Sequence, residues 1–302
     1  MVADGSGRAR PPRDLPGEST VTQILWLASY PKSGNTWLRA FLANYLHDGP
    51  EPEDINVLPR FNFGDMRIEF YEKVSGIKAA NLSWHDINTL RPRVHRHFAK
   101  ARQGLVFVKT HSILSAIEDI PTITPEVTFG AIYVVRNPLD VAVSFSHHSG
   151  YSIEEAVKAL CDKDFVHPGG HGQIMQALSD WSGHVKSWLR APGLYVRVLR
   201  YEDMVANPVT TFGTIPEFLK VPRDRRRLKK AVRFSSFKVL AEQEEKAGFR
   251  EASPNAPRFF HRGRVGVWRE ALSPEQADRI VACHRETMSE MGYFSSIGKL
   301  LV

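Results

Sequence analysis

A short segment near the start of the chain contains the residue types that hold phosphate groups in proteins. It spans residues 30–37 and reads YPKSGNTW. Lys32 supplies a positive charge, and Gly34 lets the backbone approach an anion closely. The lysine precedes the glycine, and no earlier glycine is present, so the spacing differs from the GxxxxGK[ST] loop that positions magnesium beside a nucleotide. Taken alone, the segment is also compatible with a strand-to-helix turn that bears a solvated lysine.

A second group of polar residues ends the apolar run at 104–111, where Lys109, Thr110 and His111 follow one another. A neutral imidazole is a suitable general base for a hydroxyl acceptor near neutral pH. A lone histidine also commonly has a purely structural role, and this alternative stays open for His111.

Two further segments could bind anions. Arg136 ends another apolar run, and Ser144 follows eight residues later, about two helical turns away. A guanidinium and a hydroxyl at this spacing could hold one phosphate from two sides, although Arg136 could instead pair with Asp140. Residues 261–269, HRGRVGVWR, combine two glycines with four basic residues. This composition suits either a loop that closes over an anion or a basic surface loop.

The elements that must position these residues follow from hydrophobic patterning. Short apolar runs predict buried parallel strands at 24–29, 104–111, 129–136 and 194–201. Helical spacing predicts helices at 36–46, 139–147, 153–160 and 174–190. Within 50–103 it predicts short helices at best. The chain after the last strand is predicted to be mostly helical, with a loop at 248–266. Strands that alternate with helices indicate a single α/β domain, a central parallel sheet flanked by helices. Ligands of such sheets bind at the carboxyl ends of the strands, where the polar segments follow.

Composition limits the alternatives. The chain has 302 residues, a formal charge of +7 and two cysteines without a CxxC spacing, so neither a disulfide framework nor a thiolate zinc site is indicated. Residues 1–22 are rich in Gly, Pro and Arg and lack a signal-peptide core, so we expect a disordered tail before an ordered domain at 23–302. The sequence has neither an apolar stretch long enough for a membrane span nor a carboxylate cluster with metal-site spacing, and a cytoplasmic protein is expected.

The four segments, in this order, resemble the cytosolic PAPS-dependent sulfotransferases, where PAPS is 3′-phosphoadenosine-5′-phosphosulfate. The family's YPKSGxTW, KTH and RNxxDxxxS motifs are matched at 30–37, 109–111 and 136–144, and its RKGxxGxW motif is matched in part at 261–268. RYEDM at 200–204 and SSF at 235–237 are similar to two further family segments. The resemblance covers about residues 23–272 and implies a P-loop-NTPase-like sulfotransferase fold.

The resemblance also implies roles for individual residues. His111 would be the general base, and Lys32 and Lys109 would assist at the transferring sulfuryl group. PAPS would be the co-substrate and PAP, its desulfated form, the product, with no metal. The residues implied to bind the co-substrate are Lys32, Ser33, Gly34, Asn35, Thr36, Trp37, Arg136, Ser144, Tyr201, Ser235, Phe237, Arg262 and Gly263.

The sequence departs from the family at two places. His261 stands where the family has an arginine, so a contact with the 3′-phosphate is expected to be weaker or pH-dependent. The KxxxTVxxxE dimer motif is not matched after Trp268, which leaves the oligomeric state open. The acceptor is expected to be a small molecule with a hydroxyl or an amine, bound by the stretches 50–90, 145–175 and 240–261. Core packing is the favoured explanation for each aromatic candidate in the first stretch: Phe61, Phe63, Phe70, Tyr71 and Trp84.

Two other functions are compatible with parts of the sequence. A nucleotide-dependent kinase on a related sheet would depend on Mg²⁺ and bind ATP. A non-enzymatic protein that binds anions or nucleic acid would use the basic run at 223–230, which also reads as a solvated helix face. The resemblance favours the enzyme, with neither a nucleic acid nor a membrane as partner.

Overall fold

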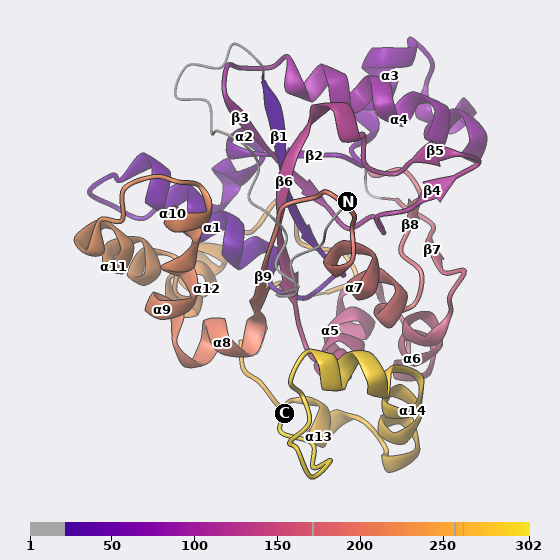
Figure 1. The fold of residues 1–302 in the computed structure, drawn as a ribbon, viewed down its shortest axis with the longest axis vertical. Coiled ribbons are helices and arrows are strands. Elements are labelled where there is room, and N and C mark those ends of the chain that lie inside the picture. The colour runs from indigo at the N-terminus through magenta and orange to yellow at the C-terminus, as the bar shows by residue number, and fades with distance from the viewer. Residues whose placement is uncertain (1–21, 171, 257, 262) are drawn as a thin grey trace, which may run out of the picture.

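The centre of the molecule is a five-stranded parallel sheet (Figure 1). The computed structural model describes residues 22–302 except 171, 257 and 262, so the tail expected at 1–22 lies almost wholly outside the described residues. In spatial order the strands are β2 (Phe63–Gly64), β3 (Leu105–Thr110), β1 (Gln23–Ser29), β6 (Thr128–Val135) and β9 (Val196–Arg200). Every pairing within this sheet is parallel. The predicted α/β architecture is confirmed.

Helices and short turns complete the chain. The longer helices are α1 (Asn35–His47), α3 (Ile68–Ser75), α4 (Trp84–Ala99), α5 (Pro138–Ser149), α6 (Ile153–Cys161), α7 (Trp181–Leu189), α11 (Arg225–Phe234), α12 (Phe237–Ala247) and α14 (Pro274–Glu290). The short ones are α2 (Leu58–Phe61), α8 (Tyr201–Ala206), α9 (Pro208–Phe212), α10 (Thr214–Phe218) and α13 (Trp268–Ala271). Small hairpins and 3-10 turns are β4 (Ala116–Ile117) with β5 (Ile120–Pro121), β7 (Val166–His167) with β8 (Gln176–Ala177), η1 (Ile55–Val57), η2 (Ala79–Asn81) and η3 (Pro125–Val127).

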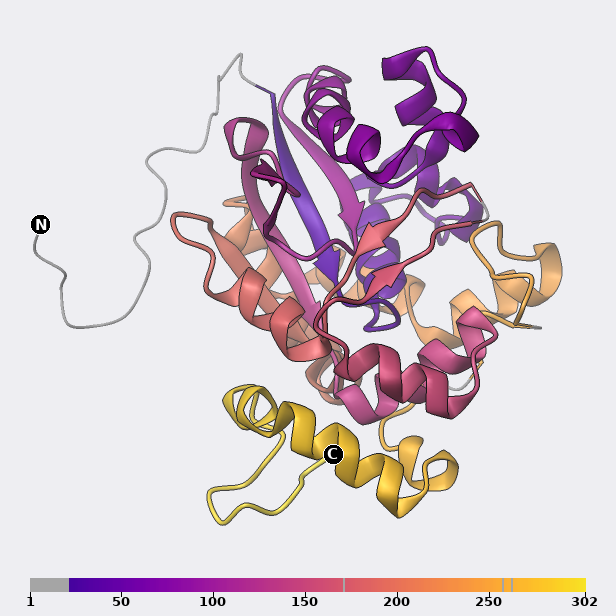
Figure 2. The same cartoon turned by 90° about the vertical axis from the view of Figure 1, so that its right-hand side faces the viewer.

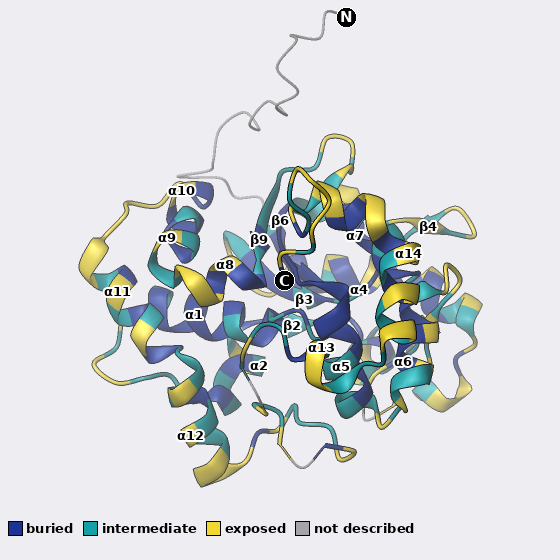
Figure 3. Cartoon of the chain, turned by 90° about the horizontal axis from the view of Figure 1, so that it is seen from below, coloured by how far each residue is buried: buried dark blue, intermediate teal, exposed yellow. Residues whose placement is uncertain are grey.

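Both faces of the sheet are covered, which is why its strands read as continuous apolar runs. Trp26 belongs to a core with side chains of α4, α5, α6, α7 and α14. Its neighbour Leu27 belongs to a second core with α1 and α8 to α11. The two groups of helices lie on opposite sides of the sheet in Figures 1 and 2. Figure 3 shows the buried strands at the centre and exposed residues on the outer faces of the helices.

The prediction of only short helices within residues 50–103 is wrong, because α4 is a 16-residue helix. Ser83 and Asp86 form a capping box at its start, and this signal was present in the sequence. Pro92 lies inside the helix and polar residues are frequent, which obscures the helical spacing. Tertiary packing overrides these weak local preferences, since one face of the helix joins the core through Ile87, Leu90, Val94 and Phe98.

The helix predicted at 174–190 is also shorter than expected. It begins at Trp181, because Asp180 caps it by accepting a hydrogen bond from the backbone of Gly183. The preceding residues form β8, which pairs antiparallel with β7. This hairpin, absent from the sequence prediction, lies beside the site described below.

The basic run at 223–230 has a structural role in part. Arg227 donates hydrogen bonds to the carbonyls of Tyr45 and Leu46, at the end of α1. Lys230 forms an ion pair with Asp48 just beyond that end. Cations at the carboxyl end of a helix stabilise its exposed carbonyls, so two residues of the run hold α11 against α1.

Strand register brings the polar segments to one edge of the sheet. Ala28 is opposite both Thr110 of β3 and Tyr133 of β6. Val135 is in turn opposite Arg200 of β9. Four strands therefore end side by side, and the residues that follow them emerge at the same edge.

Candidate active site

The loop between β1 and α1 has an unusual backbone. Lys32 has φ 67° and Gly34 has φ 108°, both in the left-handed region. The Gly34 carbonyl accepts hydrogen bonds from the backbone of Trp37 (3.0 Å) and Leu38 (3.2 Å), which starts α1 at this point. The first turn of α1, all of it described, contains no acidic residue. The positive end of the helix dipole is therefore available to an anion.

Three cationic side chains line one cavity at this edge, namely Lys32, Lys109 and Arg136. Burial, together with the charges of Lys109 and Arg136, lowers the pKa of Lys32 to about 7. The Lys32 ammonium lies 3.9 Å from the centre of the Phe259 ring. Burial also lowers the pKa of Lys109. Cations that depress one another's protonation are expected where an anion belongs.

Arg136 is held by the backbone on two sides. Its guanidinium donates to the carbonyls of Lys32 (3.3 Å) and Arg264 (3.2 Å), and its Nε atom is buried without a hydrogen-bond partner among the described residues. The expected pairing with Asp140 is long, at 3.9 Å. The Asp140 carboxylate instead accepts hydrogen bonds from the backbone of Gly266 (2.9 Å) and Trp268 (3.0 Å). Asp140 thus holds the C-terminal basic loop over the cavity.

Aromatic side chains form the adjoining part of the cavity wall. Trp37 and Tyr201 meet edge to face at 5.9 Å, and Arg136 lies 4.3 Å from the centre of the Tyr201 ring. A Cβ atom placed on Gly263 would lie 2.3 Å from the ring of Phe237, so only glycine permits this close approach. Flat aromatic faces of this kind suit the stacking of a planar base.

His111 lies in the cavity wall with one ring nitrogen held by the backbone. Its Nδ1 atom lies 2.8 Å from the carbonyl oxygen of Ser29, so Nδ1 bears the hydrogen. Burial, with Lys109 nearby, holds the pKa of His111 well below its ordinary value. In the neutral ring Nε2 is then the nitrogen with the free lone pair. His184 fixes the backbone at this point, since its Nε2 donates to the His111 carbonyl (2.9 Å).

Glu251 connects the C-terminal loop to the cations. Its carboxylate binds both terminal nitrogens of Arg39 (2.7 and 2.5 Å) and lies 3.5 Å from the Lys109 ammonium. Burial alone would raise the pKa of this carboxyl, but the charges of Arg39 and Lys109 outweigh it and hold the pKa below its ordinary value. Glu251 therefore stays ionised and limits the movement of Lys109.

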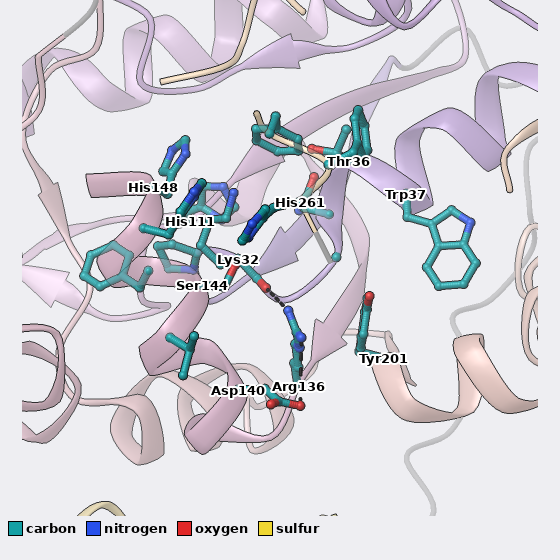
Figure 4. A pocket seen from close by; sticks show the side chains of 18 of the residues that line it. Lys32, Thr36, Trp37, His111, Arg136, Asp140, Ser144, His148, Tyr201 and His261 are labelled. Atoms are coloured by element: carbon teal, nitrogen blue, oxygen red, sulfur yellow. Dashed lines mark hydrogen bonds and ion pairs between the residues drawn. The ribbon is translucent and has the colours of Figure 1, made fainter. Parts of the chain in front are cut away.

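The cavity formed by these groups has a volume of about 430 Å³, within the ~300–1,000 Å³ of small-molecule sites. Figure 4 shows Lys32, His111 and Arg136 around it. Its lining includes most residues selected from the sequence: Lys32, Gly34, Asn35, Thr36, Trp37, Lys109, His111, Arg136, Ser144, Tyr201, Phe237 and Gly263. Ser33 and Ser235 are buried behind the wall instead. The Ser235 hydroxyl donates to the Ala231 carbonyl inside α11 (2.8 Å). Arg262 lies outside the described residues.

Several lining residues were not selected from the sequence. His148 has a buried Nδ1 without a hydrogen-bond partner among the described residues, and burial lowers the pKa of His148 to about 3. Glu251 is another such residue. His261, which the sequence analysis noted in place of the family arginine, also lines the cavity and stacks on His147 with ring centres 4.6 Å apart. His148 lies four residues after Ser144, the last residue of the RNxxDxxxS motif, so its position in the sequence could have indicated it. No local signal pointed to Glu251.

Within residues 22–302, leaving aside 171, 257 and 262, no three His, Cys, Asp or Glu side chains are grouped to hold a metal ion. In the same residues no helix has the length and apolar character needed to cross a membrane.

Comparison of the sequence with protein families gives one match, to the sulfotransferase domain, over residues 23–292. Among curated relatives, cytosolic sulfotransferase 1 of Arabidopsis thaliana is 25% identical over 84% of this chain and 75% of its own. Sulfotransferase 1B1 of Mus musculus is 26% identical over 92% of this chain and 84% of its own.

Solved structures show the same fold. The mouse sulfotransferase SULT7A1 in complex with PAP superposes with a TM-score of 0.59 at 22% identity, covering 89% of this chain and 86% of that one. Retinol dehydratase in complex with androsterone and PAP gives the same TM-score at 17% identity, over 88% and 81% of the two chains. With the family match over most of its length and a cationic cavity at the strand ends, the chain belongs to the sulfotransferase domain family and is a sulfotransferase of the PAPS-dependent kind.

Proposed function

We propose that this protein transfers the sulfuryl group of PAPS to a hydroxyl, or an amine, of a small-molecule acceptor, with His111 as general base. The observation that supports this most strongly is the convergence of an anion site, an aromatic wall and a neutral imidazole on one cavity. Cations and helix amides can stabilise the charge of a transferring group without further cofactors.

The proposed position of the co-substrate follows the cavity wall. The 5′-phosphosulfate lies at Lys32 and the positive end of α1. The 3′-phosphate lies between Arg136, Ser144 and the loop at Gly263, with Arg262 contributing as the family resemblance implies. The adenine lies against Trp37, Tyr201 and Phe237. Ser33 and Ser235 do not line the cavity, so we assign them to shaping the wall rather than to direct contact.

The proposed reaction is a single in-line displacement. Nε2 of His111 takes the proton of the acceptor hydroxyl as its oxygen attacks sulfur. The bond between sulfur and the bridging oxygen of the 5′-phosphate breaks, and that oxygen leaves on PAP with the electron pair. Lys32 and Lys109 stabilise the developing negative charge. Glu251 positions Lys109 through the 3.5 Å ion pair.

We also infer the context in which the enzyme works. Residues 23–302 act as one sulfotransferase domain, as the match over 23–292 supports. The protein acts in the cytoplasm, as the name of the Arabidopsis thaliana relative suggests. Neither a metal nor a nucleic acid takes part. Two of the basic residues that a nucleic acid would contact already hold α11 against α1.

His111→Asn tests the general base. Asparagine can retain a donor toward the Ser29 carbonyl but cannot accept the proton, so we expect kcat to fall by about 10²–10⁴-fold and PAP affinity to change little. Transfer from radiolabelled PAPS to an acceptor panel, with PAP binding measured in parallel, provides the readout. His85→Asn is the matched control, because His85 is exposed and does not line this cavity. Normal turnover by His111→Asn would remove the base assignment. Tight binding of Mg-ATP without PAP binding would instead favour a kinase.

A further inference from the structure

A second cavity, of about 700 Å³, adjoins the first at His111. Its lining comes mainly from residues 56–72, 167–170, 172–176 and 250–255, together with Arg39 and residues 109–111 and 148–151. The side chains that line both cavities are Lys109, His111, His148, His167, Gln173, Gln176 and Glu251. If the proposed function holds, a molecule in the second cavity presents its hydroxyl to the imidazole that faces the co-substrate.

Hydrogen bonds tie these walls together. The side-chain amide of Asn56 donates to the Gly248 carbonyl (3.0 Å) and accepts from the backbone of Arg250 (2.9 Å). On the opposite side, the backbone of Ile68 donates to the Gly172 carbonyl (2.9 Å). The second cavity is thus built from segments with defined mutual positions, so its lining can select a ligand.

Most of the side chains in this lining carry polar or charged groups. Its apolar side chains are Pro59, Met66, Ile68, Tyr151, Pro168 and Ala252. Of the aromatic residues that the sequence offered for an acceptor site, Phe61, Phe63, Phe70 and Tyr71 pack in the core, and Trp84 lines neither cavity. Phe61 stacks on Phe107 (5.1 Å) and Phe63 on Phe98 (4.9 Å). An apolar acceptor would bury polar groups of the wall without giving them partners, which is unfavourable. A molecule with many hydroxyls would satisfy them.

The charges of the lining are unevenly satisfied. Each acidic side chain has a partner: Glu69 with Arg67 (2.9 Å), Glu72 with Lys78 (3.2 Å), Asp65 with Thr110 (2.7 Å) and Glu251 with Arg39. The guanidinium groups of Arg60 and Arg250, both exposed residues, have no hydrogen bond or ion pair with any described residue. Asp65 is the one carboxylate of the lining without an ion pair among the described residues, because its partner Thr110 is neutral. Two unpaired guanidinium groups against one such carboxylate leave an excess of positive charge in this cavity.

We propose that the acceptor is a hydrophilic, polyhydroxylated molecule with an anionic group such as a carboxylate. Arg60 and Arg250 bind the anion, and one hydroxyl of the same molecule faces His111. Guanidinium groups suit this role because they bind carboxylates in a planar, bidentate arrangement. This inference rests on the proposed function. It assigns the protein an acceptor chemistry unlike that of androsterone, the ligand of the retinol dehydratase structure.

The test is calorimetric titration of the protein saturated with PAP. The probes are methyl β-D-glucuronide, methyl β-D-glucoside and 2-naphthol, which represent an anionic polyol, a neutral polyol and an apolar alcohol. We expect the glucuronide to bind at least about tenfold more tightly than the other two. Arg60→Ala and Arg250→Ala should each weaken the glucuronide by about tenfold and leave glucoside and PAP affinities unchanged. Arg226→Ala, on the exposed surface of α11 outside both cavities, is the matched control.

The preceding PAP titration separates this inference from the proposed function. Failure of PAP to bind would count against the function itself. With PAP bound, equal or tighter binding of 2-naphthol, no saturable binding of the glucuronide, or unchanged glucuronide affinity in both arginine variants would each overturn the acceptor assignment.

Discussion

Protonation of Lys32 should be coupled to binding of PAP. Burial and two neighbouring cations lower the pKa of Lys32 from 10.5 to about 7 in the free protein. The negative phosphates of PAP oppose both effects, so the pKa should return toward its ordinary value in the complex. Binding above pH 7 must then take up a proton.

The size of the effect follows from these two pKa values. At pH 8 only about a tenth of the free protein has a charged Lys32, whereas nearly all of the complex does, so about 0.9 proton is taken up for each PAP bound. The affinity for PAP should consequently fall by about tenfold for each pH unit between roughly pH 7 and pH 9. The phosphates of PAP, with a second pKa near 6, are already ionised in this range and contribute little.

Calorimetry at pH 8 in buffers with different ionisation enthalpies measures the uptake directly. Lys32→Arg should abolish it, because a guanidinium stays charged, while Lys246→Arg, an exposed substitution outside both cavities, should leave it intact. An uptake below about 0.2 proton in the unmodified protein, or the same uptake in Lys32→Arg, would refute the reasoning.

Two further predictions concern the framework of the site. Gly34→Ala places a Cβ atom 2.8 Å from Tyr201 at a positive φ, and should weaken PAP binding by more than about tenfold. Gly76→Ala has a positive φ but no atom within 4 Å of the new Cβ, so it should cost about 1 kcal/mol of stability with PAP affinity unchanged; equal PAP losses in both variants would contradict the steric argument. Arg39→Met leaves the Glu251 carboxylate without its bidentate partner and should lower the free energy of unfolding by about 3 kcal/mol, the low end of the range because Lys109 remains 3.5 Å away. Urea denaturation measures this loss. Combining Arg39→Met with Glu251→Leu removes the unpaired carboxylate as well, so the double variant should regain the stability that the single variant loses. A cost below about 1 kcal/mol for Arg39→Met would show that the ion pair is not structural.

Local sequence was sufficient where neighbouring residues determine the structure. A strand buried on both faces must be apolar throughout, so residues 24–29 and 129–136 identified β1 and β6. Because parallel strands end at one edge, the sequence also indicated that Lys32, His111 and Arg136 share a site. Where local signals conflict the prediction failed, as at α4, whose Pro92 and polar residues concealed a helix that the core stabilises.

Contacts between distant segments were decided only by the tertiary structure. The sequence offered an Arg136–Asp140 ion pair as an alternative, and the two groups lie 3.9 Å apart. The stronger contact of the Asp140 carboxylate is with the backbone of Gly266, 126 residues away. Arg39 and Glu251 meet across 212 residues. Periodicity and turn chemistry describe interactions along a few residues of chain, whereas such pairs depend on which loop packs over which strand end. The sequence by itself therefore determined the class of fold and most of the residues that meet in the first cavity, and only packing decided how its cations are restrained and which charges line the second cavity.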